Sequence, residues 1–437
     1  MALPRWPNQF ILFCLISLVQ AYTVFETNCS TPATLSNYVS SPNTRGTLDI
    51  LWSSVFTIFA CTWSVQHPNV PEQQQDAGNQ TSKGWWRGDK WVLRSFYRST
   101  LRMLWTVIAP ELIIVAACDE LLEARKNYKK MQGFASEDGL TWSLTHSYYA
   151  NMGGFVVRNP LADKEIYHDP YHLTGEEIFD LRKRGHITKL PDMTEAEIKD
   201  KSKGDMLGKM IALGQIAWST IQIIVRVARR LPVSPLEVAV VAFAVCAVLI
   251  YVLYWNKPQR VGVTQTIQIN DIHALYNKAK LEASPRFFKG LFQGMKSAFG
   301  TSFEEPLRGA PINVDSIDNS DDSVLFIASA SAAVFGGIHA LAWNFAFPSR
   351  IELVFWRCAS IYSAAAPACS VLFILLSNAL PSSNRLAHNT PFILAMFLLV
   401  LYPIPRLFII VEMFRTLYFL PPASFISTWP TNVPHLA

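Results

Sequence analysis

The feature that most constrains this fold is a set of apolar runs about as long as membrane-spanning helices. The clearest, residues 236–255, reads LEVAVVAFAVCAVLIYVLYW and carries a single charged residue. About 20 residues at a helical rise of roughly 1.5 Å cross the hydrocarbon core of a bilayer. Half of the 437 residues are apolar and only 16% are charged, against about 25% in soluble domains. The sequence therefore predicts an all-α fold, that of a polytopic helical membrane protein.

Six runs are predicted to span the membrane, and a seventh segment is ambiguous. The six lie at 47–66, 208–228, 236–255, 324–347, 354–377 and 391–413, so that 206–256 forms a hairpin and 324–415 holds three spans. The seventh, at 101–118, has Pro110 and Glu111 in its middle and basic residues on both sides, whereas a spanning helix has an asymmetric flank. We interpret it as a re-entrant or interfacial helix kinked at Pro110, with seven spans if it crosses.

The first 21 residues are typical of a signal peptide. Arg5 precedes an apolar run, Phe10–Val19, that is too short to span, and Ala21 supplies a small residue at the cleavage site. An uncleaved first helix is the alternative. Residues 22–46 are then a short lumenal or extracellular segment, and the sequon at Asn28 predicts glycosylation.

Residues 67–205 are mainly soluble in composition outside 101–118, and they carry strong helix-start signals. A Ser or Thr followed three residues later by Glu forms a capping box, because each side chain bonds the other residue's backbone N–H. Four such boxes pair Thr174 with Glu177, Thr194 with Glu197, Ser234 with Glu237 and Ser349 with Glu352. We expect capped cytoplasmic helices in 67–205. Three tryptophans mixed with basic residues at 85–98 indicate a membrane interface on that side.

The segment 257–323 is predicted to hold a basic amphipathic helix and an acidic, disordered linker. Apolar residues recur at helical steps in 284–300, with basic residues off that stripe. Such a helix lies on an anionic membrane surface or packs against 131–205. The stretch 304–323 is acidic without apolar periodicity. Residues 416–437 form a C-terminal tail without Lys or Arg.

Three ionisable residues at membrane depth, His339, Glu111 and Glu412, are candidate functional residues, since such groups are costly in lipid. His339 lies eight residues before Phe347, about 12 Å deep at helical rise. A neutral histidine bonded to a neighbouring helix is the commoner outcome. We therefore expect His339 to pack against a neighbouring helix rather than line an open aqueous pore. Glu412 is predicted to pair with Arg415 or with Arg406.

Other kinds of site find little support. His168 and His172 are four residues apart, but Pro170 between them favours a turn over a helical metal pair, so no metal ligand is predicted. The chain has no CxxC, HExxH, G-x-S-x-G or phosphate-binding glycine loop, and no cofactor or catalytic residue is assigned. A net charge of +5 is too small to predict nucleic-acid binding. The predicted partners are the lipid bilayer and a protein that the sequence does not identify.

Several motifs resemble a large fungal family of multi-pass membrane proteins. They include FTIFACTWSVQHPNVP, PYHLT, LPDMTEAEIKDKSKGD and GGIHALAWNFAFPSRIELVFWR, in the same order from about residue 28 to the C-terminus. Pro68 departs from the pattern, which affects only the exit from the first span. The resemblance implies a fungal, membrane-embedded protein with a signal peptide. It implies no activity, substrate or catalytic residue.

Three functions remain open. A non-catalytic scaffold or receptor-like protein, which binds a partner through cytoplasmic helices, fits the capped helices and the missing reaction centre. A transporter or channel is the alternative, although the spans show no inverted repeat. An intramembrane enzyme is third, and enzyme status is left uncertain, leaning against catalysis. Each reading predicts an integral membrane protein of the secretory pathway, in the plasma membrane or an endomembrane.

Overall fold

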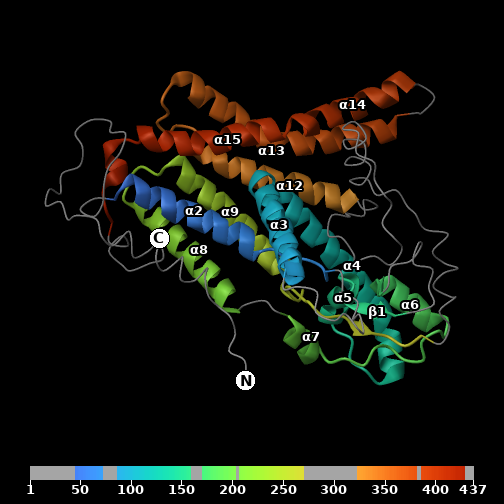
Figure 1. Cartoon of the computed structure of the whole chain (residues 1–437). Coiled ribbons are helices and arrows are strands. Elements are labelled where there is room, and N and C mark those ends of the chain that lie inside the picture. The colour runs from blue at the N-terminus through green and yellow to red at the C-terminus, as the bar shows by residue number, and fades with distance from the viewer. Residues whose placement is uncertain are drawn as a thin grey trace, which may run out of the picture. The chain divides into compact units, whose positions relative to one another are not determined.

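The structure, a computed structural model, describes residues 45–71, 86–158, 170–202, 206–269, 322–380 and 385–428, and most of these are helical (Figure 1). Several predictions fall outside the described residues: the signal peptide, Asn28, His168, the amphipathic helix at 284–300, the acidic linker to residue 321 and the end of the tail from residue 429.

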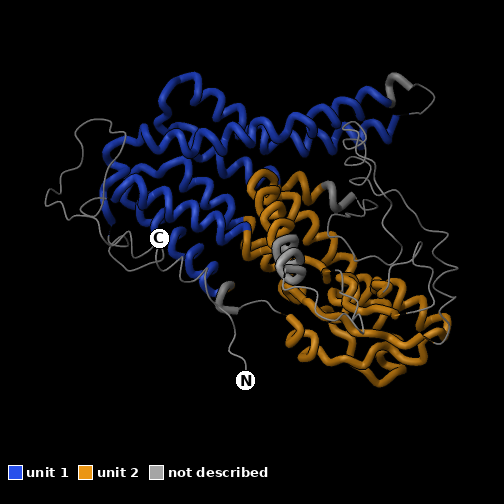
Figure 2. Tube along the Cα trace, viewed as in Figure 1, with its two compact units in different colours: residues 1–62, 210–245, 332–437 blue, residues 63–209, 246–331 orange. Residues whose placement is uncertain are grey.

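The chain divides into two compact units, blue and orange in Figure 2. Unit 1 takes its residues from Met1–Thr62, Met210–Val245 and Ala332–Ala437. Unit 2 takes its residues from Trp63–Lys209 and Cys246–Ser331. The unit boundaries fall inside apolar helices, so four helices contribute residues to both units.

Unit 1 is helical. Its elements are α2 (Thr47–Ser64), α8 (Met206–Ala228), α9 (Pro235–Leu253), α12 (Asp322–His339), α13 (Arg350–Ala379), α14 (Arg385–Leu401) and α15 (Pro403–Arg415), with short 3-10 turns at Ala340–Ala342, Thr416–Phe419 and Pro422–Phe425. Helix α13 packs along α14 and α15 (Figure 1). Hydrogen bonds join α2 to α8, where the hydroxyl of Thr57 lies 2.8 Å from that of Ser219.

A glycine sets the approach of α12 to α13. A Cβ added to Gly336 would lie 2.4 Å from the backbone nitrogen of Ala364, whereas a Cβ on Gly337 would meet nothing within 4 Å. Small residues let helix backbones approach closely in apolar bundles. The absence of a side chain at Gly336 therefore allows the backbones of α12 and α13 to approach closely.

Among the described residues, five helices lie wholly in unit 2. They are α3 (Trp86–Ile108), α4 (Pro110–Asp138), α5 (Leu144–Asn151), α6 (Gly175–Lys183) and α7 (Glu195–Lys201). Four of them, α4 to α7, contribute to the core of the unit. Helix α5 packs on α4, α6 and α7. The core draws on most parts of the unit, from Val70 through Met131, Tyr149, Phe155, Leu173 and Ile198 to Val261.

A small sheet corrects the all-α prediction. Strand β1 (Phe155–Val157) pairs antiparallel with β2 (Tyr171–Leu173) and parallel with β3 (Gln265–Thr266), so the order is β2-β1-β3. The strands have two or three residues each, too short for alternation to reveal them. Their pairing depends on residues far apart in sequence. Mostly helical is the correct description.

The four capping boxes are confirmed. Thr174 and Thr194 accept hydrogen bonds from the backbone N–H of Glu177 and Glu197, and the glutamates bond back. Ser349 and Glu352 do the same at the start of α13. At the start of α9, Glu237 Oε2 accepts from Ser234 N at 2.8 Å.

Four described helices are long and apolar enough to span a membrane: Lys209–Ala228, Pro235–Leu253, Arg350–Ala379 and Asn389–Phe419. A bent pair, Phe96–Ile108 and Pro110–Asp138, would make five if it formed one span. The remaining two of the six predicted spans correspond to α2, which is rich in Ser and Thr, and to the shorter helix Phe326–Ala342. Neither is among the four.

The helix break predicted at Pro110 is present. Helix α3 ends at Ile108, Ala109 leaves helical geometry, and Pro110 begins α4, with an angle of 109° between the two helices. Proline favours a helix start because the first position needs no backbone N–H bond. Both a broken span and a re-entrant loop have this geometry.

Candidate functional site

His339 is buried at the end of α12 in unit 1. Its Nδ1 lies 2.8 Å from the carbonyl oxygen of Phe335, one turn earlier. Its ring centroid is 6.2 Å from that of Trp356 on α13, and the indole N–H of Trp356 donates to the His339 carbonyl at 3.1 Å. The prediction that His339 packs against a neighbouring helix is confirmed. These contacts satisfy the polar groups that a helix end leaves open.

Glu412 is buried on α15, and the arginines predicted as its partners bond elsewhere. Arg415 Nη2 lies 2.5 Å from Glu352 Oε1, at the start of α13. Arg406 donates to the hydroxyl of Tyr402 at 2.7 Å, and its guanidinium lies 4.2 Å from the ring centroid of Phe335. Arg415 prefers Glu352 because α15 packs along α13, which local spacing could not reveal.

Glu111 lies in unit 2, in the first turn of α4, and is buried. A carboxylate in a first turn is stabilised by the helix dipole, so this position has a structural explanation. The three candidate residues thus fall in two units, Glu111 in unit 2 and the other two in unit 1. Each has its own surroundings.

A buried arginine in unit 1, Arg226, was not predicted as a site. Arg226, 1% exposed, donates hydrogen bonds to the carbonyl oxygens of Pro232, Ala423, Ser424 and Ile426, at 2.8–3.3 Å. A guanidinium has five N–H donors and needs many acceptors when buried. Arg226 therefore ties the α8–α9 turn to the C-terminal 3-10 segment, which is a structural role.

Glu237 has a second partner beside its cap. Its Oε1 forms a buried ion pair with Arg45, and the backbone N–H of Arg45 donates to the carbonyl of Phe425 at 3.0 Å. The sequence predicted the capping box that contains Glu237, but nothing local identified Arg45 as its second partner. The two residues are 192 positions apart.

Unit 2 holds a buried cluster of ionisable side chains around Lys257. Lys257 Nζ lies 2.5 Å from Glu120 Oε2 and 4.7 Å from the ring centroid of Tyr254. Burial lowers the pKa of Lys257, and Glu120 opposes that shift. The ring centroid of His67 lies 4.8 Å from that of Tyr254, with the two rings tilted by 41°, and burial lowers the pKa of His67 to about 3. His67 is therefore neutral at physiological pH.

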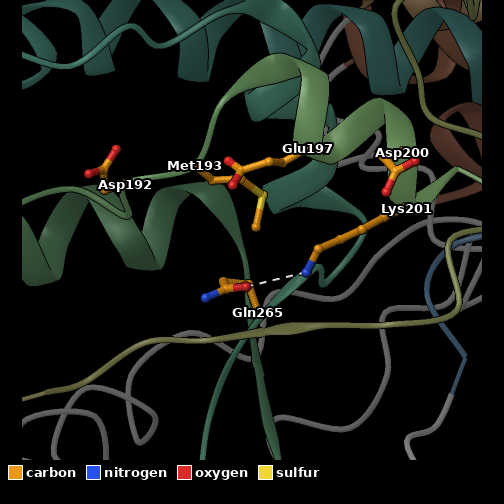
Figure 3. Close-up of a pocket in the computed structure, with 6 residues that line it drawn as sticks. All are labelled: Asp192, Met193, Glu197, Asp200, Lys201 and Gln265. Carbon is orange, nitrogen blue, oxygen red and sulfur yellow. Dashed lines mark hydrogen bonds between the residues drawn. The ribbon is translucent and has the colours of Figure 1, made fainter.

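A charged pocket lies beside α7 in unit 2 (Figure 3). It has a volume of about 220 Å³ and is lined by Asp192, Met193, Glu197, Asp200, Lys201 and Gln265. Lys201 points toward Gln265, and their side chains bond at 3.2 Å. Three carboxylates against one ammonium make the lining acidic. The pocket suits a cationic side chain.

Two contacts hold α7 and the segment just before it against α5. His146 Nε2 donates to the carbonyl of Met193 at 2.7 Å, while its Nδ1 accepts from the backbone of Ser143. Thr145 bonds Glu195 at 3.3 Å. The pocket therefore has a fixed wall.

In the parts of the chain that the structure describes, no group of three or more His, Cys, Asp or Glu side chains could hold a metal ion. His172 lies in β2, where its Nδ1 is 2.8 Å from the carbonyl of Gly153.

Residues 16–278 match the sequence model of a family described as "Family of unknown function (DUF8562)". No curated protein and no solved structure matches the chain.

Proposed function

The chain belongs to the family of unknown function DUF8562, and we propose, from its own residues, that it is a non-catalytic integral membrane protein that binds a protein partner through the helices of unit 2. In this proposal it is a scaffold or receptor-like component of the secretory pathway in a fungal cell. Its signal peptide is removed and Asn28 is glycosylated.

Six spans make up the proposed membrane part. The four helices that are long and apolar enough are joined by α2 and by Phe326–Ala342. Large apolar side chains on the outer faces of α13 and α14 support this arrangement, since Leu372 is 63% and Ile393 64% exposed. Exposed leucine and isoleucine of this extent suit lipid rather than water.

One observation carries the partner-binding part of the proposal: unit 2 contains a packed core of its own beneath well-capped helices. The core residues Met131, Tyr149, Phe155, Leu173 and Ile178 are all buried. A chain that only linked membrane helices would need no such core. A segment with its own hydrophobic core can fold as a unit, which gives a partner a fixed surface to bind.

Helix α7 and its pocket are the proposed docking face. Helix α7 is capped by Thr194 and Glu197, and the backbone N–H of Thr194 lowers the pKa of Glu197, so that carboxylate stays charged. Asp192 and Asp200 are exposed at the pocket. We propose that this face takes a lysine or arginine side chain of the partner.

The test compares charge reversals in full-length protein. Asp192→Lys and Asp200→Lys alter the pocket, while Glu123→Lys makes the same change at an exposed position of α4. After mild cross-linking in membranes, a partner should co-purify with wild type and Glu123→Lys. It should fall about ten-fold with the pocket variants, which corresponds to one lost charge-assisted contact.

A co-purified protein that is retained equally by all three variants would refute the docking face. If purified protein in vesicles instead moves a solute across the bilayer, and the His339 or Glu412 variants abolish that movement while folding normally, the transporter reading replaces ours.

A further inference from the structure

Helix α3 presents an apolar face that the described residues of unit 2 leave exposed. Phe96, Tyr97, Leu101, Leu104 and Trp105 are between 37% and 61% exposed. Tyr97, Leu101, Leu104 and Trp105 are spaced by three, four and seven or eight residues, so they share one side of the helix. Two of them are aromatic residues of the kind enriched at membrane interfaces.

The opposite side of α3 packs against other residues of unit 2. Thr106 is buried, and Gln66 donates to the carbonyl of Ser99 at 3.1 Å. The ring centroid of Phe96 lies 5.9 Å from that of Trp63, so Phe96 contacts another residue of unit 2. Helix α3 also packs on α4. The helix is therefore fixed to its unit, with the apolar face pointing outward.

Positive charge borders this face. Arg98 is exposed and Arg102 is half-buried, and both stand one residue from an exposed apolar position. In the sequence, the rest of the helix adds three basic residues and a single acidic one, Asp89. Guanidinium groups bind phosphate well and flank the apolar face of interfacial helices.

The angle between α3 and α4 fits a helix lying in the plane of a membrane. It is 109°, which is 19° from a right angle (109 − 90). The start of α4 is apolar, with Ile114, Val115, Ala116 and Ala117 within three turns of Pro110. If α4 enters the bilayer along its normal, α3 lies close to the surface plane.

We propose that α3 is an interfacial helix that binds an anionic bilayer surface, with Tyr97, Leu101, Leu104 and Trp105 inserted among the headgroups and Arg98 and Arg102 on lipid phosphates. The inference rests on the membrane part of the proposed function and adds a lipid class to it. Tyrosine and tryptophan at the level of the headgroups, with leucines on the same face and arginines beside it, are the pattern of a helix that lies in a membrane interface.

The experiment uses the full chain, with its cysteines replaced, in vesicles of phosphatidylcholine with or without phosphatidylserine. A single cysteine carries an environment-sensitive fluorophore, and quenching by aqueous iodide and by brominated lipid reports its position. The test site is Leu101. Leu372 on α13 serves as the lipid-facing reference and Arg184, exposed in unit 2, as the aqueous reference.

With phosphatidylserine, the label at 101 should be quenched by brominated lipid and protected from iodide. Arg98→Gln with Arg102→Gln should lower the ratio of inserted to exposed helix about thirty-fold, because each basic residue near an anionic surface contributes about a five-fold preference. The matched pair Lys183→Gln with Arg184→Gln, read with the same label at 101, should leave that ratio unchanged.

The outcomes separate this inference from the proposed function. If iodide quenches a label at 101 as strongly as a label at 184, while brominated lipid quenches a label at 372, the inference is overturned and the membrane proposal stands. Iodide access at 372 would overturn the membrane proposal itself. Protection of 101 from both quenchers would mean that protein covers the face. Equal insertion in neutral vesicles, unaffected by the arginine variants, would refute anionic-lipid binding.

Discussion

Two capping boxes in unit 1 have the same pattern of hydrogen bonds and ion pairs but differ in burial. They therefore make a matched pair for mutation. In each, one glutamate oxygen accepts from the cap residue and the other pairs with an arginine from a distant segment. Glu237 pairs with Arg45, and both side chains are at most 7% exposed. Glu352 pairs with Arg415, whose side chain is 53% exposed. The chemistry is shared, so burial is the main variable.

Glu237→Ala should cost far more than Glu352→Ala. Removing one partner of a buried pair leaves an uncompensated charge and costs about 3–5 kcal/mol. The lost cap adds about 1 kcal/mol. At Glu352 the cap is lost too, but the exposed pair is worth about 0–1 kcal/mol, so we expect a total of about 1–2 kcal/mol.

The assay is unfolding of the purified protein, followed by the reaction of a thiol-specific dye with the buried thiols of Cys61 and Cys246. Glu237→Gln, which keeps the side-chain shape but removes the charge, separates the ion pair from the cap. It should retain the cap and lose the pair with Arg45. If Glu237→Ala and Glu352→Ala proved equally destabilising, burial of the ion pair would not be the cause, and the reasoning would fail.

Three further predictions use other features. Gly336→Ala should destabilise the protein by about 1–3 kcal/mol through its clash with α13, whereas Gly337→Ala should be neutral or stabilising, as thermal unfolding will show. The folded-state pKa of His67, about 3, lies below its unfolded value of 6.5, so wild type should lose stability as the pH falls from 6.5 toward 3, and His67→Gln should lose less. A sequon grafted after Pro422 should be glycosylated in cells, as Asn28 should; an unmodified graft would contradict six spans.

Local sequence rules account for much of the helical framework. A capping box joins residues three apart, and a proline acts on its own turn, so both can be read without the fold. Accordingly the starts of α6, α7, α9 and α13 and the break at Pro110 are where the pattern predicted them. The depth of His339 in its apolar run likewise predicted burial.

The contacts of the candidate residues were beyond those rules. Arg415 has Glu412 one turn away, yet it pairs with Glu352 because α15 lies along α13. Arg226 bonds carbonyls up to 200 residues away, and Lys257 meets Glu120 across 137 residues. Backbone carbonyls carry no residue identity, so a sequence holds no sign of which ones a buried arginine will find.

By itself, the sequence determined that this protein is mostly helical, that four of its helices are long and apolar enough to cross a membrane, and where several helices begin. Those properties depend on neighbours within about one turn or on composition. The tertiary structure alone decided that β1 pairs with β3, that unit 2 has a core, and which charges neutralise one another. The physical reason is that burial of a polar group requires a partner, and chain folding, not sequence spacing, brings that partner near.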